Sequence, residues 1–205
     1  MAYGIFTSKK RRRLRSRWVR ANSLQFNRAN VYDIDSRYVD IECLQQGKDR
    51  YACNVISGRI NNRDILVFDY RYDVGVMHKK TVESIQAMIV PSPTPLKPLF
   101  IRPEGLIDKA SQFFGAEDLN FESAEFSRKF AVAAPDRKWA YDVIHPRMME
   151  HLLTTTRFSI QLAENAIIAW RANGFDGDDY QAAFELLDGI LERLPNYLIR
   201  EQTEQ

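Results

Sequence analysis

Alternating apolar and polar residues mark two strands in the first half of the chain, at Tyr51–Ile60 and Asp64–Asp73. Asn61 and Asn62 lie between them and tolerate the positive φ angles of a tight turn, so the pattern predicts a β-hairpin. In the second strand, alternate positions of Leu66–Tyr72 are leucine, phenylalanine and tyrosine. This face should pack inward, and the intervening face, which carries Asp and Arg, should be solvated.

Weaker signals of the same kind predict most of the remaining elements. Prolines recur through Pro91–Pro98 and indicate a stiff surface loop, since proline cannot donate to a sheet ladder. Asp136 and His145 stand where they would cap the helices that follow them. Residues 24–47 suggest extended structure broken by Asp and Asn. The expected strands are 81–90, Leu99–Arg102, Lys129–Ala134, Phe158–Leu162 and Ala166–Arg171, and the expected helices are Glu104–Phe114, Ser123–Ser127, a segment after Asp136, and Pro146–Leu153.

Between residues 178 and 194, apolar residues recur at i, i+3, i+4 and i+7, which predicts a closing amphipathic helix. Asp178 and Asp179 suit its positive N-terminal end, and Pro195 ends it. We therefore expect an α+β fold: a mainly antiparallel sheet of about seven strands, with helices in the second half and a C-terminal amphipathic helix. No repeat or interior linker divides the chain, which predicts a single domain over 23–199 and a disordered tail at 200–205.

The net charge of +2 conceals an uneven distribution of charge. Eight of the 29 basic residues and none of the 27 acidic ones fall in residues 9–20, which leaves 21 basic against 27 acidic residues, a net of −6, in the rest of the chain. A run of like charges offers little apolar surface to fold on, so we expect residues 1–22 to be a flexible basic arm. If the arm became helical on a partner, Leu14, Trp18 and Ala21 would share one face.

The arm supplies the candidate binding residues. Its cationic side chains would attract anionic lipid headgroups, and Trp18 would settle at the headgroup boundary. The same charges could release counterions from DNA or RNA, although the acidic domain makes nucleic acid the less favoured partner. A solubilising tail without a partner is the third interpretation. The predicted membrane- or polyanion-binding residues are Lys9, Lys10, Arg11, Arg12, Arg13, Arg15, Arg17, Trp18 and Arg20.

Candidate chemistry elsewhere in the chain favours structural roles. The sequence has no GxGxxG, P-loop or HExxH spacing, so we expect no cofactor and no metal. Cys43 and Cys53 are expected to be reduced thiols. Arg71 lies between Asp69 and Asp73 on one strand face, where the three would form a surface ion-pair ladder. Structural roles are also expected for the three histidines, His78, His145 and His151.

Four segments resemble those of an uncharacterised family of bacterial proteins. They are FDYRY at Phe68–Tyr72, FESAEFSRKFAV at Phe121–Val132, AYDVIHPRMMEHLL at Ala140–Leu153 and LERLP at Leu191–Pro195. The family has no assigned activity, and its longer members carry hydrophobic N-terminal membrane anchors where this chain has a basic arm. The resemblance implies a bacterial domain that works near a membrane, and it implies no catalytic residues.

These observations leave three functions open. A non-enzymatic binding or scaffolding module, held at an anionic membrane surface by the arm, is the favoured one. The alternatives are an enzyme whose site follows no sequence motif, and nucleic-acid binding through the arm. No apolar run has the length of a membrane span or the order of a secretory signal, so we expect a cytoplasmic location, peripheral at the inner membrane face. Uncovered strand edges could support a homodimer, and no other protein partner is indicated.

Overall fold

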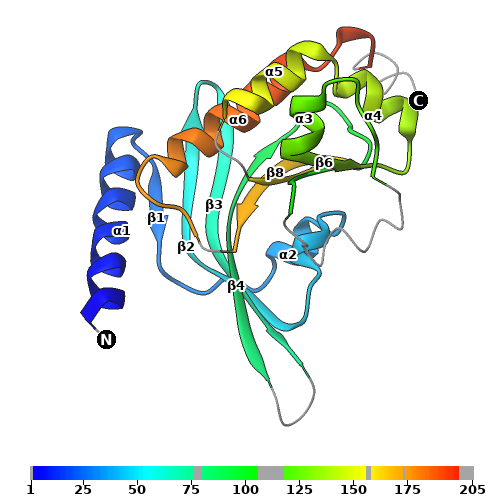
Figure 1. The fold of residues 1–205 in the computed structure, drawn as a ribbon. Helices are drawn as coiled ribbons and strands as arrows, with labels where there is room; N and C mark the ends of the chain where they lie inside the picture. Colours follow the sequence, from blue (N-terminus) through cyan, green and yellow to red (C-terminus); the bar gives the residue numbers. More distant parts are fainter. Residues whose placement is uncertain (1, 76–79, 106–117, 156–157, 173, 199–205) are drawn as a thin grey trace.

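An eight-stranded antiparallel sheet organises the fold, in the order β1-β2-β3-β4-β8-β7-β5-β6 (Figure 1). The computed structural model describes residues 2–75, 80–105, 118–155, 158–172 and 174–198, with side chains from Lys10 onward. The strands are β1 Gln25–Asn27, β2 Lys48–Ile60, β3 Arg63–Val74, β4 Thr81–Pro91, β5 Leu99–Pro103, β6 Phe130–Ala133, β7 Ser159–Ala163 and β8 Ala166–Arg171. The helices are α1 Ala2–Ala21, α2 Ile34–Arg37, the 3-10 turn η1 Glu42–Leu44, α3 Ala124–Lys129, α4 Arg137–Val143, α5 Pro146–Thr154 and α6 Asp179–Arg193.

The predicted α+β class is confirmed, and the sheet has one strand more than expected. The β2–β3 hairpin turns at Asn61 and Asn62, whose φ angles are +47° and +62°. The additional strand is β1, which pairs with β2. Two short helices, α2 and η1, occupy part of the region where the sequence suggested extended structure. The expected tail at 200–205, His78 and most of the expected helix Glu104–Phe114 lie outside the described residues.

Both faces of the sheet are covered, so neighbouring residues of β3 are buried on opposite sides. Phe68 and Tyr70 pack with Leu44 and the rest of the segment that follows β1, so the aromatic face of this strand packs inward as predicted. Val67 is equally buried, but in the core that α5 and α6 cover. Figure 1 shows these two helices lying across one face, with α2 on the other. The prediction that this face of β3 is solvated is therefore wrong at Val67, which the helices cover, and correct at Arg71, which is exposed.

Two helix starts confirm the caps expected from the sequence. The Asp136 carboxylate accepts a hydrogen bond from the Trp139 N–H at 3.0 Å, which satisfies a free donor of the first turn of α4. His145 Nδ1 accepts from the Met148 N–H at 3.3 Å, and Pro146 occupies the first position of α5. His145 thereby acts as a structural residue, as predicted.

Helices α5 and α6 approach closely at Gly189. The ring of His151 lies over this glycine, and its Nε2 lies 3.1 Å from the Leu186 carbonyl oxygen, to which it donates. A Cβ atom added at Gly189 would overlap the His151 ring. Burial is the main cause that lowers the pKa of His151 below its ordinary value of 6.5. The contact therefore requires a glycine on α6, and burial there favours the neutral form of the histidine on α5.

We predict that Gly189→Ala lowers the free energy of unfolding by about 1–3 kcal/mol, because the new methyl group overpacks the α5–α6 contact. At a helix position without such a contact, the same change raises stability by roughly 0.5–1 kcal/mol. Urea denaturation therefore tests the contact, through the sign of the change in the free energy of unfolding. A variant as stable as the wild type, or more stable, would show that His151 moves aside without cost.

A second prediction concerns pH. The pKa of His151 is lower in the folded chain than in the unfolded chain. Below pH 6.5 the unfolded chain therefore binds a proton more readily than the folded chain does, and the free energy of unfolding falls as the pH drops. Above pH 6.5 the contribution of His151 to stability is fully present. Replacing the group in His151→Gln should remove that part of the pH dependence, so the two stability–pH curves should converge below pH 6.5. Parallel curves, measured by denaturation across the range, would contradict the assignment.

Candidate anion-binding surface

Helix α1 is docked on the domain, whereas the sequence predicted a flexible arm (Figure 1). The side chain of Trp18 is only 8% exposed, and its ring centroid lies 5.2 Å from that of Tyr180. Trp18 Nε1 also donates to Gln181 Oε1 at 3.3 Å. Val19 and Leu24 are buried beside it. The arm folds because the domain supplies the apolar partner surface that the arm lacks by itself.

The seat of Trp18 is continuous with the core through a row of aromatic rings. Tyr180 lies 5.5 Å from Phe175, and Phe175 lies 5.3 Å from Phe158, between ring centroids. Gln86, which is 7% exposed, donates to the Tyr180 hydroxyl at 2.8 Å and accepts from the Phe175 N–H at 2.6 Å. Burial raises the pKa of Tyr180 to about 12, so its hydroxyl stays protonated. The platform under α1 is thus hydrogen-bonded and neutral.

Two arginines on the docked side of α1 pair with carboxylates of the domain. Arg11 Nε lies 2.6 Å from Asp176 Oδ1, in an exposed pair. Arg15 Nη1 lies 3.8 Å from Asp69 Oδ2, and its side chain is only 15% exposed. The Arg15 guanidinium also lies 4.8 Å from the centroid of the Phe26 ring. An exposed pair such as Arg11–Asp176 contributes about 0–1 kcal/mol, so it orients α1 more than it holds it.

The pairing of Asp69 differs from the ion-pair ladder expected along β3. Asn54 Nδ2 donates to Asp69 at 2.6 Å, and Asp73 pairs with Lys80 at 3.6 Å. Asn54 adopts a φ of +53° where the β2–β3 register shifts, and such a bulge re-aims the side chain. Together with Arg15, it holds the Asp69 carboxylate while the neighbouring Arg71 lies exposed on the same strand face.

The remaining cations of α1 point away from the domain. At about 100° per residue, Lys10, Arg13, Arg17 and Arg20 fall within an arc of about 80°, roughly opposite the docked side. All four are exposed, and none forms an ion pair with any residue that the structure describes. Arg20 Nε donates to the Ser16 carbonyl of its own helix at 3.2 Å. We refer to these four residues as the outer face of α1.

The structure separates the nine residues predicted as one binding set. Trp18 is buried, so it reaches a lipid headgroup boundary only if α1 detaches. By its position in the helix, Lys9 falls about 20° outside the arc of the outer face. Sequence reasoning missed the domain residues that α1 faces, because they lie far apart in the chain and follow no motif. The nine residues divide into the outer face of Lys10, Arg13, Arg17 and Arg20 with Lys9, the docked side of Arg11, Arg15 and Trp18, and Arg12 between them.

Other candidate chemistry is sparse in the described part of the chain. Within those ranges, no three His, Cys, Asp or Glu side chains are grouped in a way that could hold a metal ion. None of the helices described there is both long and apolar enough to cross a membrane. Cys43 and Cys53 are buried thiols that are not joined in a disulfide, and burial is the main cause that raises the pKa of the Cys53 thiol. Such a thiol reacts slowly.

We predict that Trp18→Ala releases α1 from the domain, because about 3–5 kcal/mol of packing is lost when a buried tryptophan is truncated. Amide hydrogen exchange should become fast across α1 while β2, β3 and β4 keep their protection. Arg17→Ala on the outer face is the matched control and should leave exchange unchanged. Undiminished protection of α1 in Trp18→Ala would mean that other contacts hold the helix.

Comparison with known proteins adds a likeness of fold. The sequence matches no family model and no curated protein. The structure is similar to the crystal structure of the mycobacterial trehalose monomycolate transport factor A, TtfA, with a TM-score of 0.65 and 14% sequence identity. The alignment covers 89% of this chain and 95% of that chain. At this level of identity the likeness is one of fold alone.

Proposed function

We propose that this protein is a non-enzymatic binding or scaffolding module that associates with an anionic membrane surface through the outer face of α1. The observation that carries the proposal is the orientation of the helix. Docking through Trp18 turns Lys10, Arg13, Arg17 and Arg20 away from the domain, where they form no ion pair with a described residue. The location we propose is the cytoplasmic face of a bacterial inner membrane.

Charge distribution supports an oriented association. Basic residues near an anionic leaflet contribute about 1 kcal/mol each, so the outer face supplies several kcal/mol. Outside residues 9–20 the chain has 21 basic and 27 acidic residues, a net of −6, and such a surface is repelled by anionic lipid. The protein should therefore meet the membrane with α1 first. Electrostatic attachment of this kind is reversible and is weakened by salt.

Two likenesses are compatible with this role. TtfA is a trehalose monomycolate transport factor, and a part in transport favours binding over catalysis for a chain of the same fold. The segments of the sequence that resemble an uncharacterised bacterial family point the same way, since longer members of that family have membrane anchors. The basic helix would replace the anchor with a weaker, reversible attachment.

Replacing the outer face should abolish membrane binding while the fold persists. We predict that the variant with glutamine at Lys10, Arg13, Arg17 and Arg20 loses at least about tenfold in partition onto phosphatidylglycerol-containing vesicles, measured by co-sedimentation at low salt. The control replaces four exposed basic residues elsewhere, Lys48, Arg137, Lys138 and Arg147, with glutamine, which changes the net charge equally.

Binding by the control at wild-type strength, and loss by the outer-face variant, is the expected pair of results. Equal binding by wild type and outer-face variant would refute the proposal. Stronger binding to a DNA duplex than to the vesicles, with a steep salt dependence, would favour the nucleic-acid alternative instead.

A further inference from the structure

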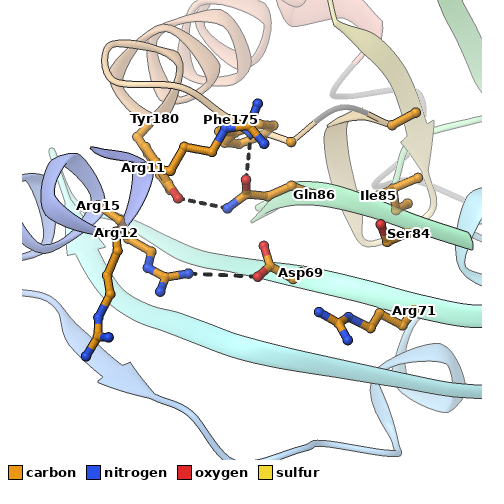
Figure 2. Close-up of a pocket in the computed structure, with 12 residues that line it drawn as sticks. Arg11, Arg12, Arg15, Asp69, Arg71, Ser84, Ile85, Gln86, Phe175 and Tyr180 are labelled. Atoms are coloured by element: carbon orange, nitrogen blue, oxygen red, sulfur yellow. Dashed lines mark hydrogen bonds and ion pairs between the residues drawn. The ribbon is translucent and has the colours of Figure 1, made fainter. Parts of the chain in front are cut away.

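A second group of cationic residues lies on the docked side of α1. Here a cavity of about 400 Å³ opens between that helix, β3, β4 and the segment before α6 (Figure 2). Cavities that hold small organic ligands begin at roughly this size. The platform of Gln86, Phe175 and Tyr180 forms one wall. Gln86 has both ends of its amide engaged with that wall, so it shapes the cavity and leaves the binding of a ligand to other groups.

Positive charge is in excess around this cavity. Four arginines line it, Arg11, Arg12 and Arg15 from α1 and Arg71 from β3. Asp69 is the single carboxylate among the described lining residues, and Asp176 neutralises Arg11 from outside, so two positive charges remain unbalanced. Like charges at close range repel one another, and one carboxylate cannot compensate four guanidinium groups. An anionic ligand in the cavity would reduce this repulsion.

The arginines differ in what they can offer. In Figure 2, Arg71 extends toward Asp69 and Arg15, whereas Arg12 turns its guanidinium away from them. Arg71 is exposed on its strand face, and a hydrogen bond with Tyr51 is the main cause that raises its pKa, so it stays charged. The Arg15–Asp69 contact is long, at 3.8 Å, and leaves guanidinium donors unused. Arg15 and Arg71 are therefore the two groups able to bind a ligand together.

Neighbouring groups define the chemical class of the ligand. A guanidinium presents a planar fork of N–H donors that matches the oxygens of a phosphate group. The exposed hydroxyl of Ser84 adds a further donor at the cavity rim. Phe175 and Tyr180 provide an aromatic wall for the uncharged remainder of a ligand. Asp69 opposes an anion, but the bond from Asn54 places it to hold Arg15 in position.

We propose that this cavity is a binding site for the phosphate group of a phosphate ester, with Arg15 and Arg71 as its ligands. The site is separate from the outer face of α1, so it goes beyond the membrane association proposed above. A soluble phosphate ester and the phosphomonoester headgroup of a lipid share this chemistry. The outer face and the cavity lie on different sides of the same helix.

Isothermal titration calorimetry with inorganic phosphate, at low ionic strength and against chloride, tests the site. Arg71→Gln should weaken phosphate binding at least about tenfold, because charge-assisted hydrogen bonds to the anion are lost. Arg13→Gln on the outer face removes the same charge and should bind phosphate like the wild type. Asp69→Asn should bind phosphate several-fold more tightly, since it removes the opposing charge and keeps an acceptor for Asn54.

Vesicles separate the two sources of the phosphate group. Phosphatidic acid in phosphatidylcholine vesicles presents a phosphomonoester, and phosphatidylglycerol at the same surface charge presents a diester. A preference for phosphatidic acid that is lost in Arg71→Gln identifies a lipid headgroup, and phosphate binding without that preference identifies a soluble ester. Phosphate affinity that is equal in wild type and Arg71→Gln, or no tightening in Asp69→Asn, would overturn the site. The outer-face variant tests the membrane proposal independently, since it leaves Arg15 and Arg71 intact.

Discussion

The burial of Trp18 against Tyr180 fixes the orientation of α1, and both candidate surfaces follow from that orientation. A helix that contains eight cationic residues would otherwise have no preferred face. The aromatic seat, supported by Gln86 and Phe175, selects one face for docking. It therefore directs one set of basic residues outward, and turns Arg11 toward Asp176 and Arg15 toward Asp69 of β3.

The sheet supplies the other half of the arrangement. The middle of the sheet is buried on both faces, under α5 and α6 on one side and the segment around α2 on the other. The helical layer ends near Tyr180, and past this point the strand face changes from apolar to polar at Asp69 and Arg71. Helix α1 crosses this uncovered end and closes a cavity over it. A polar strand face that would otherwise be wet thus becomes the floor of an arginine-lined site.

Local signals in the sequence were sufficient for much of the fold. The hairpin turn at Asn61, the caps at Asp136 and His145 and the closing helix depend on neighbours within a few residues, and each was predicted. The docking of α1 was not predicted, because the shared face of Leu14 and Trp18 says nothing about its partner. That partner is formed by residues about 160 positions away, which are Tyr180 and Gln181.

The sequence predicts only part of the candidate site, because the rest depends on contacts between residues that are far apart in the chain. The composition of the chain indicates the basic residues of the arm. In the fold, these residues lie partly on the outer face of α1 and partly on its docked side. Asp69 and Arg71 were interpreted as members of a surface ladder, since period-2 alternation places them on one strand face. The bulge at Asn54 and the approach of Arg15 changed the partners of Asp69, and both depend on tertiary structure.

We propose that the outer face of α1 meets an anionic membrane while Trp18 stays packed against Tyr180. Tryptophan fluorescence on phosphatidylglycerol vesicles that contain brominated lipid, compared between the wild type and Trp18→Phe, measures this directly. We expect the wild type to bind the vesicles with no quenching that depends on Trp18, because the ring remains packed on Tyr180. Quenching that disappears in Trp18→Phe would contradict it, since Trp18 would then have left the domain for the lipid.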